Sequence, residues 1–236
     1  MNTVAPRLMP AQLLRLAILM PAKNEAAVIG EVVAEVRGQF PGACLIVIDD
    51  GSQDATAEIA AKAGAKVLRL AAPLGAWGAT QTGMRYALKQ GCTICVTMDA
   101  DGQHLACEIS KLLKTMEQVQ AGVVIGACPQ RGSPARQLAW WGFRALTGFA
   151  LEDLTSGFRA YGRRAMELLA SPRATLLEYQ DVGVLLLLRA KGIKIAETSV
   201  VMHERRHGKS RVFASWWQVA IYLFQTLLLC LASSRR

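Results

Sequence analysis

The first 130 residues alternate between short apolar runs and longer segments with helical spacing. The apolar runs predict strands at 16–20, 45–48, 66–70, 93–98 and 123–126. The helical spacing between them predicts helices at 25–39, 54–63, 76–90 and 105–120. Such alternation is typical of βαβ units and of a parallel sheet that is buried on both faces. Because ligands bind at the carboxyl ends of such strands, we expect the functional loops there.

The pattern changes after residue 128. A basic loop and an apolar, aromatic segment at 138–150 precede the sequence TSGFRAY at 155–161. Periodicity predicts helices at 162–170 and 178–191 and a strand at 192–201. Neither a repeat nor a long linker divides the chain. We therefore expect one α/β domain at 1–211 and a separate C-terminal segment at 212–236.

Composition and charge narrow the classes of partner. Of the 236 residues, 52% are hydrophobic and 19% are charged, and the formal net charge is +9. Charged residues fall below the average of about 25%, which excludes a disordered chain and favours membrane contact or extensive burial. The excess positive charge indicates an anionic partner. It is concentrated at 129–145, 203–211 and 235–236, without the interleaved aromatic residues of a nucleic-acid surface.

The six cysteines lie mostly in apolar runs. Cys92 and Cys95 form a CxxC pair, but no second pair or histidine cluster accompanies it. We therefore expect small buried hydrophobic side chains in a reducing compartment, not a zinc or redox site.

Acidic residues follow two of the predicted strands. Asp99, Asp101 and Gln103 alternate directly after the strand at 93–98, where two carboxylates and an amide oxygen can face one Mg²⁺ or Mn²⁺. An ordinary polar turn is the alternative interpretation. Asp49 and Asp50 follow the strand at 45–48 and can accept hydrogen bonds from a ribose or a base. The absence of GxGxxG and GxxxxGK[ST] argues against a Rossmann dehydrogenase and a P-loop NTPase.

Six motifs occur in the order seen in family-2 glycosyltransferases: PAKNE, DDGSQDAT, LGAWGATQTGMRYA, MDADGQH, TSGFRAY and ERRHGKSR. The chain most resembles the branch of dolichyl- and polyprenyl-phosphate sugar transferases. That resemblance implies a GT-A fold with a mostly parallel central sheet. It also implies an inverting transfer from a nucleotide-diphospho-sugar in which Mg²⁺ or Mn²⁺ stabilises the leaving diphosphate.

The resemblance also implies roles for individual residues. The nucleotide-sugar site would comprise Pro21, Ala22, Glu25, Asp49, Asp50 and Asp99. The metal would be held by Asp99, Asp101 and Gln103. Phosphate or acceptor contacts would come from Ser156, Arg159, Arg205, Lys209 and Ser210. The residues expected to act in catalysis are Asp101, Arg159 and Asp181.

The role of Asp181 depends on the acceptor. An acceptor hydroxyl needs a general base, whereas an acceptor phosphate is already anionic. Asp181 is therefore the candidate base only for a hydroxyl acceptor, and a carboxylate at a helix start is the alternative. The chain also departs from the family pattern, with Trp77 near the start of the glycine-spaced segment and Gln81 where arginine is common. These departures put one contact to the donor phosphate in question.

Residues 212–232 contain no charged side chain. As a helix they would extend about 31 Å at about 1.5 Å per residue, near the thickness of a bilayer core. Trp216 and Trp217 beside the basic run are typical interfacial anchors. The segment is expected to be an apolar, membrane-associated helix that either spans the bilayer or lies flat. The basic run places the protein on the cytoplasmic face of the membrane.

Together these features predict a membrane-associated glycosyltransferase that modifies a lipid-linked acceptor, most simply polyprenyl phosphate. The near alternative is transfer to a sugar or lipid hydroxyl with Asp181 as the base. The distant alternative is a non-catalytic membrane protein that binds nucleotide. Nothing in the sequence sets the oligomeric state, the base or the sugar.

Overall fold

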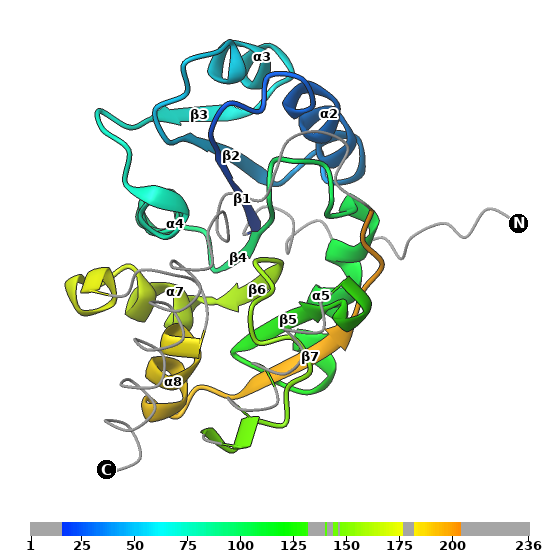
Figure 1. The fold of residues 1–236 in the computed structure, drawn as a ribbon, viewed down its shortest axis with the longest axis vertical. Helices are drawn as coiled ribbons and strands as arrows, with labels where there is room; N and C mark the ends of the chain where they lie inside the picture. The colour runs from blue at the N-terminus through cyan, green and yellow to red at the C-terminus, as the bar shows by residue number, and fades with distance from the viewer. Residues whose placement is uncertain (1–15, 132–139, 141–143, 146, 177–181, 204–236) are drawn as a thin grey trace, which may run out of the picture.

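The computed structural model describes residues 16–131, 140, 144, 145, 147–176 and 182–203. Within these residues a seven-stranded sheet has the strand order β3-β2-β1-β4-β6-β5-β7 (Figure 1). The strands are β1 (Leu16–Ala22), β2 (Cys44–Asp49), β3 (Lys66–Arg69), β4 (Ile94–Thr97), β5 (Val123–Ala127), β6 (Arg159–Gly162) and β7 (Ile195–Ser199).

All the strands of this sheet run in one direction except β6, which runs against them. The pairs of β1 with β2, β1 with β4, β2 with β3 and β5 with β7 are parallel. β6 lies between β4 and β5 and pairs with both in antiparallel orientation. The start of β6 therefore lies at the carboxyl end of β4, where Thr97 pairs with Arg159.

Helices cover both faces of the sheet. Figure 1 shows α4, α7 and α8 along one side of it and α2 and α5 along the other. The helices are α2 (Ile29–Gln39), α3 (Thr56–Lys62), α4 (Gly75–Lys89), α5 (Ala106–Gln118), α7 (Arg163–Leu169) and α8 (Val182–Ala190). Two 3₁₀ turns, η1 (Pro129–Arg131) and η2 (Pro172–Leu176), complete the elements.

Alternation of side chains divides the core into two layers. In β1, Ala17 and Leu19 pack in the layer that contains α4 and α7, whereas Leu16, Ile18 and Met20 pack in the layer that contains α2 and α5. The same period of two continues in β2 and β4, as expected where successive side chains point to opposite faces. Burial on both faces explains why these strands are continuous apolar runs.

The predicted elements are confirmed with shifts of a few residues at their ends, and the structure adds one strand. The helix expected at 178–191 is described from Val182 onward, and the strand expected at 192–201 is Ile195–Ser199. The added strand is β6, whose sequence RAYG has no apolar run and begins with an arginine. Among the described residues, no helix is both long and apolar enough to cross a membrane. The predicted helix at 212–232 lies outside them.

Three thiols gather at the amino ends of the strands, opposite the carboxyl edge. Cys44 and Cys95 both pair with Ala17 in the sheet register. Cys92 and Cys95 are buried in the core beside α4, as the sequence predicted, while Cys44 is half-buried. A hydrogen bond with Cys92 lowers the pKa of Cys44 to about 7, against the effect of burial and with help from the Arg37 charge.

This pKa predicts selective alkylation of Cys44. At pH 7 the Cys44 side chain is a thiolate in about half of the molecules. Cys107 on α5 is more exposed, but partial desolvation raises the pKa of its thiol. The thiolate is the nucleophile, so modification of Cys44 by iodoacetamide should slow as the pH falls below about 7. Peptide mass spectrometry across a pH range of about 6–8.5 measures both rates. Faster labelling of Cys107 than of Cys44 at neutral pH would contradict the prediction.

Candidate functional site

The motifs meet at the carboxyl edge of the sheet. The loops after β1, β2 and β4 begin at Lys23, Asp50 and Met98 and leave the sheet at this edge. Because β6 runs antiparallel to β4, β6 begins at this same edge, and the TSGFRAY segment enters the sheet there. Segments that are far apart in sequence are thereby assembled along one edge.

Side chains of the loop after β2 hold the loop after β1. The main-chain N–H of Asn24 donates to Oγ of Ser52 at 2.9 Å, and Oδ1 of Asn24 accepts from the N–H of Gln53 at 2.7 Å. The N–H of Glu25 donates to Oγ1 of Thr56 at 2.8 Å. Asn24 has a φ of 52°, a left-handed conformation that asparagine tolerates better than most residues. The two motifs therefore form one structural unit.

Asp54 completes this unit. Its Oδ2 accepts from the N–H of Ala26 at 3.2 Å and its Oδ1 accepts from the N–H of Thr56 at 3.1 Å, at the start of α3. Desolvation opposes ionisation, but the hydrogen bonds from Thr56 and Ala26 outweigh it and hold the pKa of Asp54 below its usual value. Asp54 therefore links the loop after β1 to the start of α3.

Three of the residues predicted to contact the nucleoside, in β1 and in the loop after it, lie where this unit meets the sheet. Pro21 and Ala22 end β1, and Glu25 begins the turn into α2. The carbonyl of Ala22 also accepts the main-chain N–H of Asp50 at 2.9 Å, so β1 and β2 stay paired up to the edge.

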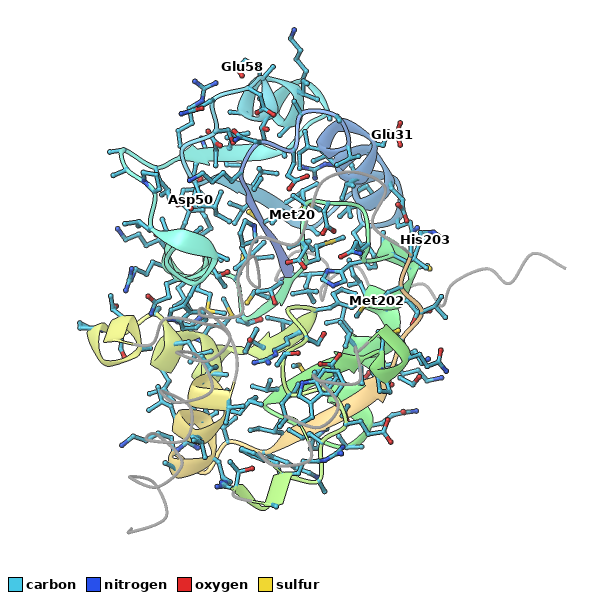
Figure 2. The ribbon with its side chains drawn as sticks, in the orientation of Figure 1. Met20, Glu31, Asp50, Glu58, Met202 and His203 are labelled. Carbon is cyan, nitrogen blue, oxygen red and sulfur yellow. The ribbon has the colours of Figure 1, made fainter. Side chains whose placement is uncertain are left out.

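Asp49 and Asp50 differ in their hydrogen bonds. Oδ1 of Asp49 accepts from the N–H of Ser52 at 3.1 Å. The Asp50 carboxylate accepts two main-chain N–H groups at the start of α4. One is from Leu74, just before the helix, at 2.6 Å, and the other is from Gly75, its first residue, at 3.0 Å. Both carboxylates are buried, and Figure 2 labels Asp50 above α4. Asp50 thus fixes the start of α4 in addition to any contact with a nucleotide.

The predicted metal ligands follow β4 directly. The Asp99 side chain is 53% exposed, whereas Asp101 and Gln103 are buried. Oδ1 of Asp101 accepts from the N–H of Gln103 at 3.0 Å, so the turn also has the hydrogen bond expected of ordinary turn chemistry.

The chemistry of this donor set suits a cation that arrives with a substrate. The described residues contain no group of three or more His, Cys, Asp or Glu arranged to hold a metal. Two carboxylates and one amide would leave the other coordination positions of Mg²⁺ or Mn²⁺ to water and phosphate oxygens. This is the usual arrangement for such ions. A β-carbon at Gly157 would lie 3.4 Å from Oδ1 of Asp99, which is an ordinary van der Waals distance, so Gly157 and Asp99 are direct neighbours.

The SGFR segment is tied to both neighbouring strands. Oγ of Ser156 donates to the carbonyl of Gly126 in β5 at 2.6 Å. Oγ1 of Thr97 in β4 donates to the carbonyl of Gly157 at 2.7 Å. These bonds place Gly157 between the ends of the two strands and against Asp99.

Arg159 is fully buried inside this segment. Its Nε donates to the carbonyl of Ser156 at 2.7 Å and its Nη2 donates to the carbonyl of Leu154 at 2.9 Å. Nη1 is buried without a hydrogen-bond partner in the part of the chain that the structure describes. This placement favours a role in holding the loop over direct contact with a phosphate.

Two residues that depart from the family pattern pack on α7 and η2. The indole N–H of Trp77 donates to the carbonyl of Ala174 at 2.9 Å, and Nε2 of Gln81 donates to the carbonyl of Leu169 at 2.7 Å. Arg85, one turn further along α4, donates through Nε to the carbonyl of Ala170 at 2.8 Å. The spacing of these three residues defines one helical face, which explains why Gln81 is buried.

Glu197 is a structural residue of the site that the sequence did not indicate. Its two carboxylate oxygens accept the N–H groups of Glu152 and Asp153 at 2.7 and 2.8 Å, which anchors the loop before SGFR to β7. Burial raises the pKa of Glu197, against the effect of these hydrogen bonds. A glutamate in a strand is a signal only once β7 and this loop are known to be neighbours.

Four predicted site residues lie outside the described part of the chain: Asp181, Arg205, Lys209 and Ser210. Their expected roles stay predictions.

Comparison with known proteins identifies the family. The profile of glycosyl transferase family 2 matches residues 17–166, which is more than half of the chain and includes five of the six motifs. The chain belongs to glycosyl transferase family 2. It is accordingly a glycosyltransferase. The loops at the carboxyl edge of the sheet lie within the part of the chain that the family match covers.

Two relatives match this chain over most of their own length. The chain is 27% identical over 219 residues to the polyprenol monophosphomannose synthase of Mycolicibacterium smegmatis, with 85% of this chain and 82% of the relative covered. It is 31% identical over 202 residues to the dolichyl-phosphate hexose transferase of Haloferax volcanii, with 80% and 83% covered.

A solved structure supports the GT-A-like fold. The glucosyl-3-phosphoglycerate synthase of Mycobacterium tuberculosis, in complex with Mn²⁺, uridine-diphosphate-glucose and phosphoglyceric acid, matches with a TM-score of 0.71. The match covers 98% of this chain and 86% of that chain at 21% sequence identity. At this identity the likeness concerns the fold.

Proposed function

We propose that this family-2 glycosyltransferase moves a sugar, with inversion, from a nucleotide-diphospho-sugar to polyprenyl phosphate. The observation that carries the proposal is the meeting of the Asp99–Gln103 turn, the joined loops after β1 and β2, and the SGFR segment at one edge. The relatives named as transferases of polyprenol and dolichyl phosphate support the acceptor class.

The donor would lie across the loops after β1, β2 and β4. Asp49 and Asp50, with Pro21, Ala22 and Glu25, would contact the nucleoside. Asp99, Asp101 and Gln103 would hold Mg²⁺ or Mn²⁺ against the diphosphate. When bound, the cation stabilises the charge that grows on the leaving nucleoside diphosphate as the bond to the sugar breaks.

A phosphate acceptor simplifies the chemistry of attack. Its oxygen is already anionic, forms the new bond to the anomeric carbon and needs no general base. Asp181 would then support the site without taking a proton. Ser156 and Arg159 would shape the acceptor side from within, and Arg205, Lys209 and Ser210 would contact phosphate directly.

The remaining segments would place the enzyme at its lipid substrate. Residues 1–211 would form the catalytic domain, and residues 212–236 would form an apolar helix and basic tail that associate with the membrane. The helix would either span or lie flat, and the basic run would keep the active site on the cytoplasmic face.

A transfer assay with paired acceptors tests the proposal. Full-length protein in detergent is incubated with Mn²⁺, a panel of nucleotide sugars, and either polyprenyl phosphate or the matching polyprenol. We expect sugar on the phosphate alone, with release of nucleoside diphosphate. Transfer to the polyprenol, together with near-complete inactivity of Asp181→Asn, would favour the hydroxyl acceptor. Metal-dependent nucleotide binding without transfer from any donor would contradict enzymatic function.

A further inference from the structure

His104 is joined to Asp99 through its imidazole ring. Nδ1 of His104 accepts the main-chain N–H of Asp99 at 2.8 Å. Because Nδ1 is the acceptor, the proton of the neutral ring is on Nε2. Nε2 lies 3.8 Å from Oδ2 of the same aspartate, which is beyond hydrogen-bond distance, so the contact that fixes Asp99 is the one from its main-chain N–H to Nδ1.

The ring cannot easily turn away from this position. His104 is 5% exposed, and its ring stacks on Phe158 with a centroid distance of 4.8 Å and an interplanar angle of 15°. Phe158 follows Gly157, which is a direct neighbour of the Asp99 carboxylate. The SGFR segment therefore supports the imidazole while the imidazole supports Asp99.

A second connection joins this turn to the segment that follows β7. His104 forms an antiparallel bridge with Met202, and the N–H of His203 donates to the carbonyl of Gln103 at 2.9 Å. Figure 2 labels Met202 and His203 on this segment. The main chain around His104 thus holds together the Asp99–Gln103 turn and the residues that lead into the basic run at 203–211.

We propose that His104 is a positioning residue that orients Asp99 as a metal ligand and couples this ligand to the segment entering the basic run. The inference rests on the proposed function. Groups that orient metal ligands from outside the ligand shell change metal affinity by about 10–100-fold when they are removed. Asp99 depends on such support more than Asp101 does, because its side chain is half exposed while Asp101 is buried.

The variants His104→Phe and His104→Asn separate positioning from packing. Phenylalanine keeps an aromatic ring over Phe158 but removes the acceptor for the Asp99 N–H. Asparagine keeps a carbonyl acceptor in a smaller side chain. His203→Asn is the matched control, because His203 is exposed and contributes its main-chain N–H, which asparagine retains.

Two measurements decide the inference. Electron paramagnetic resonance gives the Kd of Mn²⁺ with uridine or guanosine diphosphate present, and amide hydrogen exchange reports the Asp99 N–H without metal. We expect His104→Phe to weaken Mn²⁺ binding about 10–100-fold and to speed exchange at Asp99, with partial recovery in His104→Asn and no change in His203→Asn.

Equal Mn²⁺ affinity in wild type and His104→Phe would overturn the inference, even if exchange at Asp99 became faster. If His104→Phe does not fold, the His104→Asn variant decides. The inference is overturned if this variant binds Mn²⁺ more weakly than wild type while amide exchange at Asp99 is unchanged. Sugar transfer by the wild-type chain decides the proposed function separately. A wild-type chain that transfers sugar but binds no Mn²⁺ with the nucleoside diphosphate of its donor would overturn the inference and leave the transfer reaction standing.

Discussion

Replacing Asp101 with asparagine is expected to lower sugar transfer by about 10³-fold, which corresponds to about 4 kcal/mol of lost transition-state stabilisation. Asparagine is close in shape and retains an oxygen that can accept the N–H of Gln103, so the turn should persist. What it removes is the negative charge that would hold the cation on the leaving diphosphate. The effect should therefore fall on catalysis and on metal-dependent nucleotide binding together.

Glu58→Gln is the matched control for Asp101→Asn. Glu58 is an exposed carboxylate on α3 that pairs with Arg69 of the edge strand β3, and Figure 2 labels it at the top of the molecule. Its loss removes the same charge from the chain and should leave both kcat/KM and Mn²⁺ affinity unchanged. If Asp101→Asn kept a tenth of wild-type activity, Asp101 would not be the principal ligand.

The positions of the motifs along the sheet could be predicted from the sequence. Parallel strands that are buried on both faces read as continuous apolar runs, and their carboxyl ends meet at one edge. This principle places Asp49 and Asp99 near one another without any coordinates. The register shows that β2 and β4 flank β1 and run parallel to it, so both residues lie at the same edge of the sheet.

The position of SGFR could not be predicted in the same way. β6 is four residues long, begins with a buried arginine and pairs with strands that are distant in sequence. The family resemblance implies a phosphate contact for this arginine, and nothing in the local pattern indicates its burial. The hydrogen bonds from Nε and Nη2 show that Arg159 points into the loop that it holds.

Prediction from the sequence is also limited where one side chain can have two roles. Asp50 and Gln81 lie in segments that family resemblance assigns to the donor, yet both make hydrogen bonds to distant main chain in this structure. Such bonds depend on the packing of α4 against β2 and α7, which no local pattern records. Asp54 is different, because its bond from the N–H of Thr56 joins residues two positions apart and is therefore a local feature.

Gly126→Ala is expected to destabilise the protein by about 1–3 kcal/mol, because it overfills the core at the base of the site. A β-carbon at this position would lie 2.9 Å from Cδ1 of Phe158, 3.2 Å from its carbonyl oxygen and 3.2 Å from Cγ1 of Val200. The carbonyl cannot move freely, since it accepts the N–H of Gly126 at 2.8 Å. The thermal midpoint should therefore fall by roughly 2–12 °C.

Gly38→Ala is the control that separates crowding from the general effect of replacing glycine. Gly38 lies in α2, and a β-carbon at this position would have nothing within 4 Å, so alanine should stabilise the helix by up to ~1 kcal/mol. Thermal denaturation of both variants gives shifts of opposite sign if local space decides the outcome. Because Phe158 supports the ring of His104, Gly126→Ala should also weaken Mn²⁺ binding, whereas Gly38→Ala should not. A Gly126→Ala protein as stable as wild type would show that Phe158 can shift without cost, and the rigid support argued for His104 would then be wrong.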